Sequence, residues 1–158
     1  MGNKDDFVKH HHNYLNDYIK FADAKALGVI TINGLVMKMV YDHLTNNINE
    51  TKYFLLLLGF ILLIIGIVFS ALVVFPRTSD KQEKGLIFWE NVNSFVKDEY
   101  VKEINNISEK ELFDKMVEQN YFLAVTATKK YSVLRLAFLF SFLGYLLLVI
   151  TGLFWIMI

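Results

Sequence analysis

The chain has 158 residues, of which 54% are hydrophobic, and its 16 basic and 16 acidic residues give a formal net charge of zero. Its mean hydropathy of +0.37 is raised by long apolar blocks and not by an even spread of apolar residues. The absence of cysteine excludes a disulfide framework and a thiolate metal site, whereas the zero net charge excludes no class of partner.

Residues 1–20 are polar and contain no helix-breaking residue after Asp5, so we expect a cytoplasmic helix there. This segment contains three consecutive histidines, His10 to His12. Consecutive residues of a helix point about 100° apart, so the three imidazoles cannot bind one metal ion, and we interpret them as a solvated surface. The first apolar block begins too late for a cleaved signal peptide, so we expect every apolar segment in the mature protein.

Residues 21–44 form the weakest of three predicted membrane spans. Ala26 to Met37 carries no charge, but charged residues flank it closely on both sides. One face of this helix is small and polar, which predicts either close helix packing, with Lys38 reaching the interface, or the lining of a pore. The residues alone favour packing. We call this face the small polar seam, and its members, at spacings of three and four, are Lys20, Ala24, Gly28, Thr31, Gly34, Lys38 and Tyr41.

Residues 53–75 read YFLLLLGFILLIIGIVFSALVVF, contain no charge, and are followed by Pro76-Arg77. At about 1.5 Å per residue a helix of this length reaches roughly 34 Å, which exceeds a hydrocarbon core of about 30 Å. A soluble core helix would show polar residues on its outer face, so we predict a second span. The polar loop Thr45–Lys52 joins the two spans into a transmembrane hairpin over residues 21–75.

A soluble helical region is predicted over residues 76–131. Apolar residues from Leu86 to Tyr100 recur at helical spacing, and Asn105-Asn106 interrupts the pattern. Anionic ligands or lipids could bind where this region meets the membrane, because basic residues gather there. Composition alone favours lipid headgroups, and the alternative is a ligand whose base stacks on Trp89, Phe88 or Tyr131.

Ser108 and Glu111 form a capping box, which predicts a helix that begins at Glu109. Nothing stops this helix before the last apolar block, so we predict one continuous helix that includes the third span, residues 132–158. Arg135 lies near enough to the end of that span for its side chain to reach the interface.

The lysines and arginines beside the spans predict the orientation of the chain. The loop Thr45–Lys52 contains one such residue and the segment Pro76–Tyr131 contains nine. We therefore expect an all-α membrane protein with three transmembrane helices, a cytoplasmic N-terminus and a helical cytoplasmic insert between the second and third spans.

Chemistry of the common enzyme classes has no signature in this sequence. It contains no GxxxxGK[ST], GxGxxG, GxSxG or HExxH motif. Any Ser–His–Asp set would have to be assembled from scattered residues, and the soluble region is small for an active site. We therefore expect no enzyme, no metal site and no cofactor.

Six short motifs occur in order over about residues 18–148. They are FADAKA at Phe21–Ala26, then Pro76-Arg77, Ile87-Phe88-Trp89, Tyr100, Gln119-Asn120-Tyr121 with Leu123-Ala124, and Lys129-Lys130-Tyr131. In this order and spacing the chain resembles the small membrane effectors of bacterial anti-phage nucleotide-signalling systems, the family named for the Pycsar transmembrane effector. Related effectors act beside the nucleotide-making enzymes of CBASS-like and Hailong systems.

The resemblance implies a membrane effector of anti-phage defence. In such families a cytoplasmic face senses a nucleotide second messenger from a partner nucleotidyltransferase or cyclase. The membrane part then compromises the bacterial inner membrane, which leads to abortive infection. In Hailong systems a short DNA oligomer holds a channel shut until infection removes it. The resemblance fits activation and block equally, and it does not name the nucleotide.

Three spans cannot enclose a pore alone, so we expect a homo-oligomer, and specifically a tetramer, that forms a ligand-gated channel in the lipid bilayer. The alternative is a non-conducting adaptor that recruits a cytoplasmic protein through Ser108–Ala127; a transporter subunit is disfavoured because the spans lack broken helices and midplane acids. The candidate pore-lining residues are Asp23, Lys25, Thr31, Asn33, Gly34 and Lys38. The candidate ligand-binding residues are Arg77, Lys81, Trp89, Lys129, Lys130 and Arg135. The symmetry of the oligomer would repeat the basic ones around its axis and concentrate positive potential there.

Overall fold

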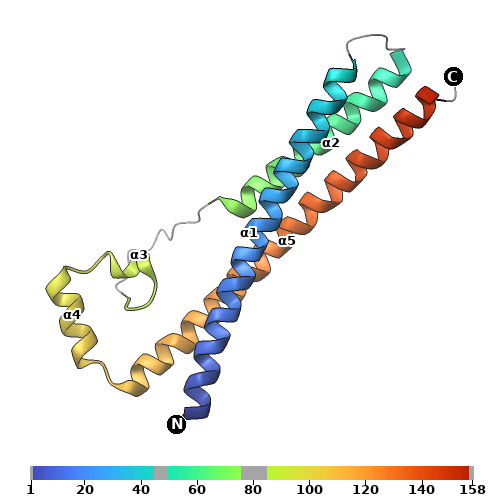
Figure 1. The fold of residues 1–158 in the computed structure, drawn as a ribbon. Helices are drawn as coiled ribbons and strands as arrows, with labels where there is room; N and C mark the ends of the chain where they lie inside the picture. The colour runs from blue at the N-terminus through green and yellow to red at the C-terminus, as the bar shows by residue number, and fades with distance from the viewer. Residues whose placement is uncertain (1, 45–49, 76–84, 157–158) are drawn as a thin grey trace. The chain divides into compact units, whose positions relative to one another are not determined.

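The computed structural model describes residues 2–44, 50–75 and 85–156. Over these residues the expected all-α fold is confirmed, because every element of secondary structure is a helix (Figure 1). In chain order they are α1 (Gly2–Leu44), α2 (Glu50–Val74), α3 (Trp89–Val92), α4 (Lys97–Asn106) and α5 (Glu109–Ile156). The predicted loop between the first two spans lies mostly outside the described residues, and Glu50 already belongs to α2.

The chain divides into two compact units. One, which we call the polar unit, comprises Met1–Ile19 and Pro76–Thr128. The other, the apolar unit, comprises Lys20–Phe75 and Lys129–Ile158. Both α1 and α5 contribute residues to each unit.

Three helices are long and apolar enough to cross a membrane, as the sequence predicts. They comprise Asn3–Asp42 in α1, Tyr53–Val74 in α2 and Glu109–Leu153 in α5. The single helix predicted from Glu109 is confirmed, and the Oγ of Ser108 accepts a hydrogen bond of 3.2 Å from the backbone N–H of Glu111.

In the apolar unit, α1, α2 and α5 run alongside one another (Figure 1). Their buried residues recur at steps of three and four, or seven where one step is skipped, so each helix presents one continuous stripe to its neighbours. Most of these residues are small, which allows helix backbones to approach closely in a membrane. The stripes are Ala22, Ala26, Val29 and Asn33 in α1; Leu56, Gly59, Leu63, Gly66, Ser70 and Val73 in α2; and Leu134, Ala137, Ser141, Gly144 and Thr151 in α5.

Glycines set the distance between α2 and α5. A Cβ atom added to Gly144 would lie 2.8 Å from a methyl carbon of Leu63 and 3.1 Å from the carbonyl oxygen of Gly59. A Cβ atom on Gly59 would lie 3.1 Å from a methyl carbon of Leu148. The two backbones are therefore too close for a larger residue at either glycine without rearrangement.

The helical periodicity from Leu86 to Tyr100 corresponds to two short helices instead of one. The turn between α3 and α4 forms because the hydroxyl of Ser94 donates a 2.6 Å hydrogen bond to the carbonyl oxygen of Asn91. Phe95 then contacts Tyr100 edge to face, with ring centroids 5.9 Å apart. This apolar contact therefore joins the turn before α4 to α4 itself, between residues five positions apart, and does not lie along one helix face.

Candidate functional site

An ion pair joins α1 to α5 at the edge of the apolar segments. The Nζ of Lys130 lies 2.5 Å from the Oδ1 of Asp23, and the side chains are 12% and 32% exposed, respectively. Next to it in sequence, Ala22 belongs to a small hydrophobic cluster with Ala26, Val73 and Leu134. Partial burial makes this pair stronger than a surface ion pair and makes the loss of one partner costly. We call it the membrane-edge ion pair.

Lys25 lies two residues after Asp23 in α1 and contacts aromatic rings. Its ammonium group is 4.2 Å from the ring centroid of Phe21 and 5.7 Å from that of Tyr131. Cation–π contacts of this kind hold a lysine in place while leaving it near solvent. Two predicted pore-lining residues, Asp23 and Lys25, therefore contact the Lys130-Tyr131 segment of α5.

Asn33 is the centre of a polar network inside the apolar unit. It is fully buried, and its Nδ2 donates to the carbonyl oxygen of Leu63 at 3.2 Å and to the Oγ of Ser141 at 2.8 Å. Its Oδ1 accepts a hydrogen bond of 2.5 Å from the hydroxyl of Tyr145. A Cβ on Gly66 would collide with Ser141 Oγ, so glycine makes room for the network. One amide thus binds all three long helices together.

The small polar seam lies on the opposite side of α1 from its buried stripe. Six of its seven residues are exposed and Gly28 is partly exposed. An added Cβ on Gly28 or Gly34 would meet no heavy atom of the described residues within 4 Å. The hydroxyl of Thr31 donates a hydrogen bond along its own helix, to the carbonyl oxygen of Leu27 at 3.0 Å. Of the predicted pore-lining residues, Thr31, Gly34 and Lys38 are exposed on this seam, whereas Asn33 is not.

The predicted ligand-binding residues lie in different environments, and some lie outside the described residues. Lys129 and Arg135 are exposed, and Lys130 takes part in the membrane-edge ion pair. Trp89 begins α3, but its side chain lies outside the described residues. Arg77 and Lys81 also lie outside them. Among the described residues, only Lys130 is brought against predicted site residues of α1.

In the polar unit, a buried asparagine joins α5 to α1. Asn120 is 4% exposed, and its Nδ2 donates to the carbonyl oxygen of Val8 at 3.0 Å. Its Oδ1 is 2.9 Å from the Nδ1 of His12, which must carry the hydrogen because an amide oxygen only accepts. His12 is therefore not part of a solvated surface, as the sequence suggested. We call Asn120, Val8 and His12 the asparagine clamp.

Sequence reasoning missed the asparagine clamp and the partners of Asn33. The seven-residue spacing of Gly59 with Gly66 and of Ala137 with Gly144 is the signal that indicates a close interface between α2 and α5. Within the described part of the chain no cluster of three metal-ligating side chains occurs.

The similarity of this chain to known proteins extends over residues of both units. A family model described as the Pycsar effector protein domain matches residues 7–158. The chain is 44% identical over 151 residues to the Pycsar effector protein SaPycTM of Staphylococcus aureus, an alignment that covers 96% of each chain. No solved structure matches the chain. The similarity extends over all three long helices and both polar networks.

Proposed function

The chain belongs to the Pycsar transmembrane effector family, and on this premise we propose that it forms a homo-oligomeric ion channel controlled by a nucleotide. Family membership identifies it as a membrane effector of anti-phage defence. A channel that opens in the bacterial inner membrane would dissipate ion gradients and end infection by killing the cell. The action falls on the membrane itself, so no enzymatic step is required of this chain.

The observation that carries the channel is the exposure of the small polar seam. The protomer already buries one stripe of each long helix, and the seam lies outside these stripes. Polar and small residues at membrane depth ordinarily face other helices or a water-filled cavity and not lipid. Several copies of α1 around an axis would give the seam that environment, with Thr31 and Lys38 toward the pore. We take four copies as the working number.

The proposed orientation places the N-terminus and Pro76–Tyr131 in the cytoplasm, because nine basic residues lie in that segment and one in Thr45–Lys52. In each copy of the oligomer the exposed Lys129 and Arg135 would contribute to a ring of positive charge, which would bind an extended polyanion such as a short DNA oligomer. The membrane-edge ion pair is beside this ring and fixes α1 against α5. A ligand shifts the channel only if it prefers one helix arrangement.

Single-channel recording from purified protein in a planar bilayer tests this proposal. We expect discrete currents that change when cyclic mononucleotides or DNA oligomers are added on one side. The direction of the change gives the sign of gating. A folded, oligomeric protein without current under every condition would contradict the channel.

The adaptor function has one observation in its favour, the exposed aromatic residues of α5. Tyr121 and Phe122 are 66% and 53% exposed in the polar unit. Exposed aromatic side chains are common anchors of protein interfaces. A stoichiometric cytoplasmic partner, lost on Tyr121→Ala in a protein that carries no current, would establish the adaptor instead.

A further inference from the structure

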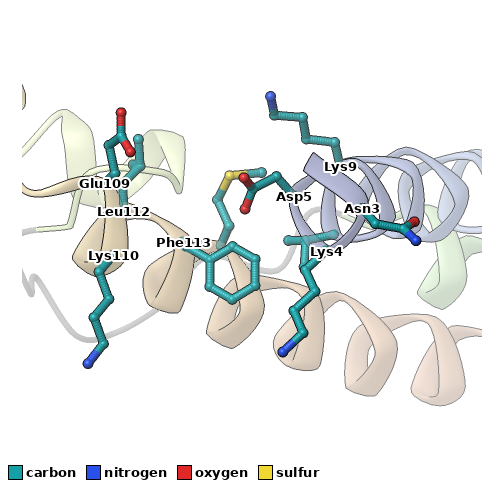
Figure 2. Close-up of a pocket in the computed structure, with 10 residues that line it drawn as sticks. Asn3, Lys4, Asp5, Lys9, Glu109, Lys110, Leu112 and Phe113 are labelled. Atoms are coloured by element: carbon teal, nitrogen blue, oxygen red, sulfur yellow. The ribbon is translucent and has the colours of Figure 1, made fainter. Parts of the chain in front are cut away.

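A cleft of about 670 Å³ lies between the first turns of α1 and the first turns of α5, within the polar unit (Figure 2). Its volume falls in the range of about 300–1,000 Å³ that is usual for small-ligand sites. None of the residues predicted from the sequence to bind ligand lines it. The lining residues are Asn3, Lys4, Asp5, Val8, Lys9, Glu109, Lys110, Leu112, Phe113 and Met116.

The lining separates into an apolar wall and a charged rim. Val8, Leu112, Phe113 and Met116 form the wall, and Figure 2 shows the ring of Phe113 between the side chains of Lys4 and Lys110. The ammonium groups of these two lysines point to the same side of the ring (Figure 2). A flat base could therefore stack on Phe113 while both lysines contact an attached phosphate.

The charge of the rim matches a singly charged phosphate. Three lysines, Lys4, Lys9 and Lys110, stand against the two carboxylates of Asp5 and Glu109, which leaves a formal charge of +1. A cyclic phosphodiester carries one negative charge, and the carboxylates can accept hydrogen bonds from sugar hydroxyls. A longer oligonucleotide adds one phosphate charge per unit and suits the more basic ring near Lys129 better.

We propose that this cleft is the binding site for a cyclic mononucleotide, with its base on Phe113 and its phosphate held by Lys4 and Lys110. This assignment rests on the proposed nucleotide control of the channel and adds the location at which the ligand binds. The ring of basic residues at the membrane edge is then free to contact lipid headgroups.

The asparagine clamp provides the connection from this cleft to the long helices. Val8 lines the cleft with its side chain, and its carbonyl oxygen accepts the hydrogen bond from Asn120. A ligand that contacts both α1 and α5 beside Val8 would change how the clamp holds the two helices. Each of these helices continues without a break, to Leu44 and to Ile156.

The test is nucleotide binding to the full-length protein in nanodiscs of zwitterionic lipid, which removes competition from anionic headgroups. The probes are four 3′,5′-cyclic mononucleotides, a DNA trinucleotide and inorganic phosphate, measured by calorimetry. We expect Lys4→Glu/Lys110→Glu to weaken the binding of the preferred cyclic mononucleotide about a hundredfold, because two contacts become repulsive. Phe113→Leu keeps apolar volume without the aromatic face and should weaken binding about tenfold.

Two controls make the result specific to the cleft. Lys97→Glu and Lys102→Glu change exposed lysines of α4 that do not line the cleft, and each should alter affinity less than about twofold. Circular dichroism and gel filtration establish that every variant is folded. A Lys110→Arg variant keeps the charge and should bind.

The outcomes separate this assignment from the proposed function. If wild-type current responds to a cyclic mononucleotide and the folded cleft variants respond equally, the channel proposal stands and the cleft assignment is wrong. Loss of affinity on Lys129→Glu but not on Lys4→Glu/Lys110→Glu also overturns the cleft. If the wild-type protein binds no probe and carries no current, both proposals fail.

Discussion

Glycines in the apolar unit occupy two contrasting environments. Gly66 and Gly144 lie where α2 and α5 are so close that an added Cβ atom would overlap side-chain atoms, at less than van der Waals distance. Gly28 and Gly34 lie on the small polar seam of α1, where an added Cβ atom meets none of the described residues within 4 Å. The same residue type thus has an evident packing role in one region and none among the described residues in the other.

This difference indicates what each surface is for. Glycine weakens a helix by about 1 kcal/mol relative to alanine, so it is expected where close packing offsets that cost. The packing at Gly66 and Gly144 is supplied by the protomer itself. At Gly28 and Gly34 no described residue supplies it, and in the proposed oligomer a second copy of α1 would do so.

The largest effect is expected from Gly66→Val. The new Cβ would meet the Oγ of Ser141, and it would lie 3.0 Å from the Nδ2 of Asn33 and 3.2 Å from the carbonyl oxygen of Ala137. We expect the free energy of unfolding to fall by about 3 kcal/mol, because the interface cannot open without losing the network. Denaturation in mixed micelles measures it. Gly152→Val, where an added Cβ atom meets no described residue within 4 Å, is the control, and equal losses in both variants would contradict the close packing.

A smaller loss is expected from Asn33→Leu, which keeps the volume and removes the polar network. The variant leaves Tyr145 without its acceptor, whereas Ser141 still donates to the carbonyl oxygen of Ala137 at 2.8 Å. Hydrogen bonds between membrane helices contribute about 0.6–2 kcal/mol each, so we expect a total loss of about 2 kcal/mol. The same micelle denaturation measures it. Thr31→Val, on the seam, should change the free energy of unfolding little. If Asn33→Leu also leaves the free energy of unfolding unchanged, the polar network does not contribute to stability.

Asp23→Asn should cost about 1 kcal/mol, because Asp23 is partly exposed and solvent weakens the attraction to Lys130. The double variant Asp23→Asn/Lys130→Met should recover most of that loss, since no unpaired ammonium group then remains. A double-mutant cycle of unfolding free energies measures the coupling. Additive effects of the two changes would mean that the membrane-edge ion pair does not hold α1 to α5. Asp42→Asn, an exposed change near the end of α1, is the control.

Local signals in the sequence are sufficient to predict the long helices. The uncharged length of residues 53–75 predicts α2, and the chemistry of Ser108 predicts the start of α5 one residue later. Periodicity failed between Leu86 and Tyr100, because it does not detect the turn that Ser94 stabilises. Signals of this kind act within a few residues of the chain.

The contacts that make the candidate site are not local. Three pairs of contacting residues are far apart in the sequence. The separations are 107 positions for Asp23 and Lys130, 108 for Asn33 and Ser141, and 108 for His12 and Asn120. Their pairing depends on the register of α1 against α5, which a one-residue shift would rotate by about 100°. Sequence analysis therefore placed Asp23, Asn33 and Lys130 among functional residues and did not predict that they bind partners inside the protomer.

Gly28→Leu is expected to have the smallest effect on the stability of the protomer. It is also the sharpest test of the contrast between the packed and the exposed glycines. Leucine is a better helix former than glycine and is well tolerated by lipid, so unfolding of the protomer should change by no more than about 1 kcal/mol. If the seam packs against another copy, the larger side chain separates the helices, and native mass spectrometry should show loss of the oligomer together with loss of current. Leu27→Ala, beside the seam, is the matched control. An intact oligomer with normal current in Gly28→Leu would mean that this face of α1 contacts lipid, and the pore would then have to be formed by a different surface.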